Sequence, residues 1–354
     1  MPLGNFRAER FRCLTSVELE LDPSANLFIG PNASGKTSLL EAAFFLSRGR
    51  SFRSRRREAL IARGEESFLL TGQALGSAGP VTLGVRATRS ATEWHVGGSV
   101  ASGIADLAEQ FPAQVIDPEV HKLLEEGPGR RRRFLDWGVF HVEHGFLPAW
   151  RRYHQALRQR NAALKLDADD DALAAWEREL ATSGEILAGQ RTAYLERIRA
   201  PLEAIGGVLL DAPITLVHQF GWDTDRLLVD ALAGDRNRDR RYRVTQHGPH
   251  RADIIVQVGR QPAKDRISRG QQKLVAAGLM LAQLQVQEQE RPGRSALLLD
   301  DPAAELDGDN LARLMDLVRD VPAQLWVTSL RSEIADHLRA ARMFHVKQGH
   351  IRAS

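Results

Sequence analysis

The sequence is short of thiols and of aromatic side chains. Among its 354 residues, 6% are aromatic and the single cysteine is Cys13. One cysteine excludes an internal disulfide framework and a cysteine-based metal site, so we expect a reduced thiol beside a strand. The length, together with an apolar content of 43%, suggests about two domains, each with its own core.

Long apolar runs are also missing. No stretch approaches the roughly 18 consecutive apolar residues that a membrane-spanning helix requires. The N-terminal sequence MPLGNFRAER has no apolar segment behind its charges, so it is not typical of a secretory signal. These absences favour a globular, cytoplasmic protein without a membrane partner.

Lysine is scarce, whereas arginine is abundant and clustered. Only six of the 48 basic residues are lysines, so the other 42 are arginines. The formal net charge is just +3. Arginines gather at residues 48–57, 130–133 and 236–243. Guanidinium groups match phosphate geometry, so these clusters suggest nucleic acid. A solvated surface remains an alternative for each cluster taken alone.

Changes of hydrophobic period divide the chain. Strand patterns surround one helical pattern at 37–47. A polar break at 167–171 separates two long helical patterns, which together predict a helical hairpin. Pro201 lies near the end of the second helix and disfavours an unbroken helix there. The strands are expected near 17–21, 27–29, 67–73, 81–87, 93–96, 214–220, 253–258, 296–300, 324–328 and 343–347. We predict an α/β head with an antiparallel β subdomain (residues 1–117 and 240–354), interrupted by a mainly helical lobe (residues 118–239).

A phosphate-binding loop stands at residues 30–37, GPNASGKT. It satisfies G-x-x-x-x-G-K-[ST] after a predicted buried strand and before a predicted helix, which is the context the Walker A motif needs. Backbone N–H groups and the helix end can hold nucleotide phosphates, Lys36 can reach the β and γ phosphates, and the Thr37 hydroxyl can bind Mg²⁺. The expected ATP-binding residues are Gly30, Pro31, Asn32, Ala33, Ser34, Gly35, Lys36, Thr37 and Ser38.

Two acids follow the run Leu297–Leu299, which predicts a buried strand ending in carboxylates. Asp300 would hold Mg²⁺ directly or through water, and Asp301 would polarise the attacking water. With Lys36, these acids form the expected catalytic set. Ordinary surface aspartates are a weaker interpretation, because adjacent acids at the end of a buried strand need a cation or hydrogen-bond donors.

A second glycine turn, Ser268-Arg269-Gly270-Gln271, opens a later helix. One helix and one turn separate it from the Asp300 strand, so it cannot easily reach the nucleotide on Lys36 of its own chain. These residues resemble the signature of ABC ATPases, which docks on the γ phosphate held by a facing Walker A loop. The resemblance predicts an ATP-dependent homodimer in which two half-sites make one whole site.

Several longer stretches resemble the RecF family of bacterial recombination mediators, whose heads are related to the SMC ATPases. They are NFRAERFRCL, FIGPNASGKTSLLEAAFFLSRGRSFR, DPEVHKLLEEGPGRRRRFLDWGVF, QRNAALK, HGPHRAD, SRGQQK and LLLDDPAAELD. The resemblance implies ATP-dependent dimerisation on DNA, slow DNA-stimulated ATP hydrolysis, and cooperation with RecR and RecO to load RecA at single-strand gaps in repair and replication restart.

The chain departs from related ATPases at a few positions. Ala33 stands where relatives carry glycine, so a positive φ there would strain it. Asp301 is shorter than the glutamate of transporter ATPases, and Thr328-Ser329 replaces their switch histidine. Gln114 is a candidate Q-loop residue, and Glu305 with Asp307 resembles the D-loop. His247 and His250 could bind a metal as a pair, but the pattern favours a structural turn over a metal site.

No base-reading motif is visible, so DNA contact is expected to be to phosphates of duplex or gapped DNA, independent of sequence. The candidate residues are Arg53, Arg55, Arg56, Arg57, Arg130 and Arg131. A bracing role for the run 130–133 stays open, because apolar residues lie beside it.

Two other classes stay open. A subunit of a transporter-type ATPase shares the same motifs, but the helical insertion and the arginine clusters count against it. A small-molecule phosphotransferase would share the loop but would have no use for Ser268–Lys273.

Overall fold

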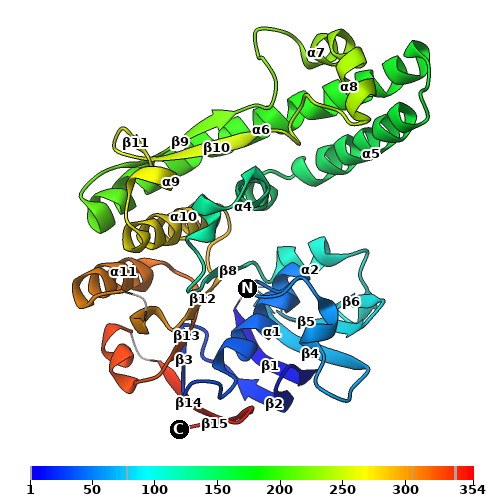
Figure 1. Ribbon diagram of the computed structural model, residues 1–354. Coiled ribbons are helices and arrows are strands. Elements are labelled where there is room, and N and C mark those ends of the chain that lie inside the picture. The colour runs from blue at the N-terminus through cyan, green and yellow to red at the C-terminus, as the bar shows by residue number, and fades with distance from the viewer. Residues whose placement is uncertain (1, 77–78, 305, 339–340) are drawn as a thin grey trace. The chain divides into compact units, whose positions relative to one another are not determined.

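The computed structural model describes residues 2–76, 79–304, 306–338 and 341–354 (Figure 1). It divides into a head unit, residues 1–120 and 269–354, and a helical unit, residues 121–268. The boundary expected after residue 117 lies close to the first division. Residues 240–268 were expected in the head but belong to the helical unit, because β10 (Asp253–Val258) pairs with β9 (Ile214–Gln219). No helix in the described ranges is both long and apolar enough to cross a membrane.

The first sheet of the head is an antiparallel meander with strand order β2-β1-β4-β5-β6-β7. Alternating burial along β4 follows the alternation of its apolar residues, so one face of the sheet points into the core. The strands are β1 (Leu3–Phe11), β2 (Leu14–Glu20), β4 (Ser67–Gly76), β5 (Gly79–Thr88), β6 (Thr92–Val96) and β7 (Ser99–Val100).

The second sheet of the head has the order β15-β14-β3-β13-β12-β8 and is parallel except for β15. Its strands are β3 (Ala25–Ile29), β8 (Ala113–Ile116), β12 (Ala296–Asp300), β13 (Gln324–Ser329), β14 (Arg342–Lys347) and β15 (His350–Ala353). Strands β12 and β13 are buried along their whole length, as continuous apolar runs in parallel sheets are. Since Ser329 lies opposite Ile29 and Thr328 opposite Asp300, the carboxyl ends of β3, β13 and β12 share one edge.

Helix α1 (Lys36–Arg48) lies between the two sheets and contacts strands of both. Residues 38–47 are all buried, which fits a helix that is mostly apolar on every side. The remaining head helices are η1 (Arg57–Leu60), α2 (Ile104–Gln110), α10 (Arg269–Glu290), η2 (Pro302–Ala304), α11 (Gly308–Asp320) and η3 (Ser332–His337).

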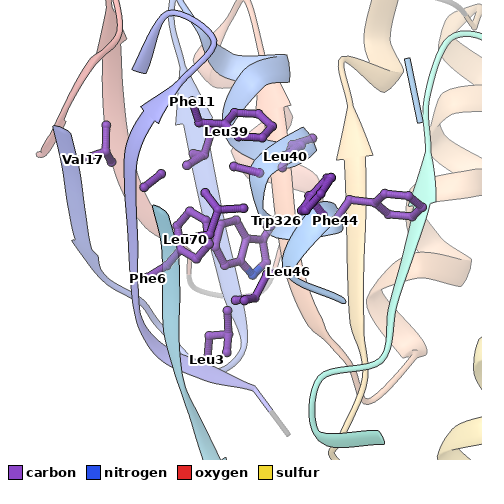
Figure 2. Close-up of a cluster of buried hydrophobic side chains, with 14 of the residues drawn as sticks. Leu3, Phe6, Phe11, Val17, Leu39, Leu40, Phe44, Leu46, Leu70 and Trp326 are labelled. Atoms are coloured by element: carbon purple, nitrogen blue, oxygen red, sulfur yellow. The ribbon is translucent and has the colours of Figure 1, made fainter. Parts of the chain in front are cut away.

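Aromatic side chains join the sheets in the core of the head. Trp326 of β13 lies edge-on to Phe6 of β1, with ring centroids 5.4 Å apart, and 5.6 Å from Phe28 of β3. Figure 2 shows Phe6 and Trp326 together, with Leu39 and Leu46 of α1 close by. Aromatic side chains from both sheets therefore pack together where α1 is enclosed.

The helical unit is built on the predicted hairpin of α5 (Phe146–Lys165) and α6 (Asp170–Leu210). The Asp169 side chain caps α6 by accepting a hydrogen bond from the Ala172 N–H at 2.9 Å. The expected break at Pro201 is wrong, since α6 continues through it to Leu210, and buried residues on both sides hold the helix. The unit also contains α3 (Lys122–Glu125), α4 (Pro128–Val142), α7 (Leu228–Gly234), α8 (Arg236–Tyr242), β11 (Gln261–Pro262) and α9 (Ala263–Arg266).

A buried ion network fastens this hairpin to α8. The fully buried Arg160 guanidinium donates to Asp239 at 2.6 Å and to Glu177 at 2.9 Å. Arg236 also donates to Glu177, at 2.6 Å. At least one arginine of the cluster at residues 236–243, Arg236, therefore has a structural role.

Removing Arg160 leaves two buried carboxylates without their shared partner. We expect Arg160→Met to lower the free energy of unfolding by about 3–5 kcal/mol, measured by urea denaturation with circular dichroism. Arg199→Met is the control, because the pair Arg199–Glu196 is about 60% exposed and should contribute under about 1 kcal/mol. Equal midpoints for the two variants would contradict this role of Arg160.

Candidate nucleotide-binding site

A cavity of about 450 Å³ opens at the shared edge of β3, β13 and β12. That volume lies within the usual range for small-molecule sites. The structure brings the predicted loop and both predicted acids together here. The lining residues are Cys13, Asn32, Ala33, Ser34, Gly35, Lys36, Thr37, Ser38, Arg53, Pro118, Asp300, Asp301, Ala304 and Leu330.

The loop presents backbone N–H groups to this cavity. Gly35 is the N-cap of α1 with φ 114°, and no side chain caps the helix. The first N–H groups of a helix have no partner within it, so they suit an anion. The Ser34 hydroxyl is also buried and has no hydrogen-bond partner among the described residues. These donors fit a nucleotide phosphate.

The turn between β14 and β15 packs against the phosphate-binding loop and forms a hydrogen bond with it. The Gly349 N–H donates to the Ser34 carbonyl at 2.7 Å. A Cβ added to Gly30 would lie 2.2 Å from the Val346 carbonyl oxygen, so only glycine allows this close approach. The first glycine of the motif is thus required by packing against β14.

Lys36 is buried and turns toward its own loop. Its ammonium donates to the carbonyls of Gly30 at 2.6 Å and Pro31 at 3.0 Å. Burial lowers the pKa of Lys36, and the charges of Asp301 and Asp300 oppose that shift. An ammonium has three donors, so the group can serve both the loop and a phosphate.

The Thr37 hydroxyl donates to Asp300 Oδ1 at 2.9 Å. That bond uses the single hydroxyl proton and leaves the oxygen lone pairs available to a cation. Mg²⁺ prefers hard oxygen ligands and keeps water or phosphate in its other positions. Thr37 and Asp300 therefore fit a Mg²⁺ ion, which would neutralise phosphate charge when bound.

Burial raises the pKa of Asp300, and hydrogen bonds from Thr328 and Thr37 oppose that shift, as do the charges of Arg53 and Lys36. Asp301 follows in a left-handed backbone conformation with φ 49°. It lines the same cavity. The two adjacent acids therefore differ in both environment and backbone geometry.

The signature residues lie elsewhere on the chain. Ser268, Arg269, Gly270 and Gln271 are exposed at the start of α10, and none belongs to the cavity lining given above. Asp307 caps α11, and the Asn310 backbone N–H lowers the pKa of its carboxyl. Glu305, the other expected D-loop residue, lies outside the described residues.

The predicted arginines differ in environment. Arg131 is buried, forms two hydrogen bonds to Asp253 at 2.8 Å, and donates to the carbonyls of Leu124 and Glu126. These contacts make Arg131 a brace within the helical unit, so they favour the bracing alternative over the predicted DNA contact. Arg130 is partly exposed and paired with Glu126.

Arg53 lines the nucleotide cavity and lies 3.7 Å from Glu41, a buried residue that also accepts from Arg12. Its placement therefore favours a nucleotide contact over a DNA contact. Arg55 and Arg56 are exposed and Arg57 is half-buried. These three remain candidates for DNA.

Gln114 is not at the strand end where a Q-loop residue would lie. It is buried in the middle of β8 opposite Leu297, and it bonds Arg48 and Gln283. Asp117 and Pro118 follow the end of β8 instead, and Pro118 lines the cavity.

The two histidines have partners within the protein. His247 contacts Asp235, and His250 contacts the Tyr153 hydroxyl and the Thr245 carbonyl. Burial lowers the pKa of His250 to about 4. These contacts favour the interpretation of a structural turn.

Sequence reasoning missed several cavity residues. Cys13 follows β1, Ala304 is the last residue of η2, and Leu330 follows β13. None belongs to a motif with fixed spacing. Only their position at the ends of strands beside the loop would have suggested them.

The fold and the site define a nucleotide-binding head of the SMC and ABC ATPase class. A head domain of Smc from Pyrococcus furiosus, solved with an extended coiled coil and a bound ScpA domain, aligns with a TM-score of 0.60 at 15% identity, covering all of this chain and 96% of that one. That likeness concerns the fold.

The family model "RecF/RecN/SMC N terminal domain" matches residues 2–352. The DNA replication and repair protein RecF of Stutzerimonas stutzeri is 40% identical, covering 99% of this chain and 97% of the relative. RecF of Chromohalobacter salexigens is 38% identical, covering 99% of each. A solved structure of the recombination mediator RecF with ATP aligns with a TM-score of 0.89 at 25% identity, covering all of this chain and 97% of that one. The chain belongs to the RecF family.

Ala33 has φ 61°, so the strain expected from its position in the loop is present. Left-handed backbone costs an alanine about 1–2 kcal/mol, whereas glycine adopts it freely. After the larger entropy of an unfolded glycine is subtracted, Ala33→Gly should raise the free energy of unfolding by about 0.5–1 kcal/mol.

The matched control is Ala59→Gly. Ala59 is also exposed in the head but is not among the positive-φ residues. This change should lower stability by about 0.5–1 kcal/mol. A loss of stability in both variants, measured by urea denaturation, would show that Ala33 is not strained.

Proposed function

We propose that this protein is an ATP-dependent DNA-binding recombination mediator. Two copies would close around ATP and Mg²⁺, each Walker A loop facing the Ser268–Gln271 turn of the other copy. The observation that carries the proposal is a cavity holding Lys36, Thr37 and both acids, while the signature turn is exposed and outside it. A site so divided is complete only when a second chain supplies the turn.

Hydrolysis in this site would be slow. Asp301 is the group available to polarise water, and its side chain is one methylene shorter than a glutamate. Lys36 and the loop N–H groups would bind the phosphates, and Thr37 with Asp300 would hold the cation. ATP would then act as a switch for dimerisation, and DNA would stimulate its turnover.

The exposed arginines support a DNA-binding role. The segment 48–57 contains six arginines and no acid, and Arg55 and Arg56 are exposed. The relatives named above are DNA replication and repair proteins. We propose that Arg55, Arg56 and Arg57 contact DNA phosphates without reading sequence, and that RecR and RecO are the partners through which RecA is loaded.

Substitutions at Lys36 and at Ser268 should impair different functions of the protein. Lys36→Met removes the charge aimed at the β and γ phosphates, so ATP binding should weaken at least about tenfold and ATP-dependent dimers should be lost. Ser268→Arg leaves the loop intact, so a fluorescent ATP analogue should still bind while light scattering detects only monomers. Loss of nucleotide binding in Ser268→Arg would place the serine in the site of its own chain.

DNA binding should depend strongly on salt. Replacing Arg55, Arg56 and Arg57 by alanine should reduce the slope of log affinity against log salt by about one unit for each arginine that contacts a phosphate. The control replaces the exposed Arg63, Arg86 and Arg89 of the head, which removes the same charge. Equal slopes in both triple variants, with dimerisation intact, would show that residues 55–57 are ordinary surface.

A further inference from the structure

Thr328 lies on the strand between β3, which leads into the phosphate-binding loop, and β12, which leads into the two acids. It belongs to β13, which pairs with β3 on one side and β12 on the other. Its register partner on β12 is Asp300. The side chain is fully buried, and it is not part of the cavity lining given above.

The Thr328 hydroxyl contacts both acids. Its Oγ1 lies 2.8 Å from Asp300 Oδ1 and 3.0 Å from the backbone nitrogen of Asp301. The Leu299 carbonyl is a more distant acceptor, at 3.4 Å. A hydroxyl has one proton and two lone pairs, so Thr328 donates to the Asp300 carboxylate and accepts from the Asp301 N–H.

These bonds fix the two acids in different ways. Thr37 also donates to Asp300 Oδ1, at 2.9 Å, so two hydroxyl groups on separate elements set the rotation of one carboxylate. The Asp301 N–H bond anchors a residue at φ 49°, a conformation that costs most residues about 1–2 kcal/mol.

The hydroxyl of the neighbouring residue, Ser329, has a different hydrogen-bond partner. Ser329 accepts a hydrogen bond from the Arg331 backbone N–H at 3.1 Å. Among the described residues, its side chain forms no hydrogen bond with either acid. The contact with both acids is therefore specific to the residue in register with Asp300.

We propose that Thr328 is the positioning residue of this site: one buried hydroxyl orients the cation-binding carboxylate of Asp300 and sets the backbone of Asp301. This inference rests on the proposed function and extends it. Thr328 thereby stands near the position of the switch histidine of transporter ATPases, and its hydrogen bonds go to the two acids.

The test compares Thr328→Val, which replaces the hydroxyl by a methyl group of similar size, with Thr328→Ser, which keeps it. The measurement is the affinity for a fluorescent ATP analogue, with Mg²⁺ and with a chelator, alongside ATP turnover. In the valine variant, the enhancement of affinity by Mg²⁺ should fall about tenfold while affinity in chelator stays close to wild type. The serine variant should retain the enhancement and the turnover.

Two further comparisons serve as controls for the valine variant. Ser329→Ala removes a buried hydroxyl from the same strand and should leave the Mg²⁺ enhancement unchanged. Thr328→Ala and Thr328→Ser both remove the methyl group and differ only in the hydroxyl, so this pair decides the question if the valine variant does not fold.

An unchanged Mg²⁺ enhancement in a folded valine variant would overturn the inference. So would a serine variant as impaired as alanine, since the hydroxyl would then not be what matters. These outcomes differ from a failure of the proposed function itself, in which the wild-type protein would bind the nucleotide neither with Mg²⁺ nor with the chelator.

Discussion

The enclosure of helix α1 between two sheets fixes the position of the phosphate-binding loop at the nucleotide cavity. Residues 38–47 are buried against strands of both sheets, so the helix cannot tilt without disturbing the aromatic contacts around Trp326. Its N-terminus is therefore held rigidly beside the cavity, in the position that the proposed binding of phosphate requires. The loop before it is held in turn by the β14–β15 hairpin, through the bond from Gly349 to Ser34.

The abundance of arginine has at least three separate causes in this fold. Arg160 and Arg131 are buried and engaged with carboxylates, so they stabilise the helical unit. Arg53 lines the nucleotide cavity beside Glu41. Arg55 and Arg56, which are exposed, and Arg57, which is half-buried, stay available to a polyanion. Composition alone cannot separate these groups, because burial and pairing depend on contacts distant in sequence.

Much of the head was predictable because its signals are local. The buried strand, glycine loop and helix around Lys36, and the leucine run before Asp300, each carry their own pattern, and the structure has strands and a helix there. The positive φ at Ala33 also followed from its place in the loop. The domain boundary near residue 240 failed because strand pairing between β9 and β10 is a long-range contact. The roles of Arg131, Gln114 and Thr328 depend on register and burial, which no single-residue pattern records.

In the proposed function, a complete nucleotide site needs two chains. The most direct test of this requirement mixes two inactive variants, Lys36→Met and Ser268→Arg, and measures ATP turnover and dimer formation in the mixture. In a mixed dimer, the intact loop of one chain meets the intact turn of the other, so the mixture should hydrolyse ATP faster than either variant alone. If the loop and the turn served the same chain, every site in the mixture would carry one defect, and turnover would not rise above that of the separate variants.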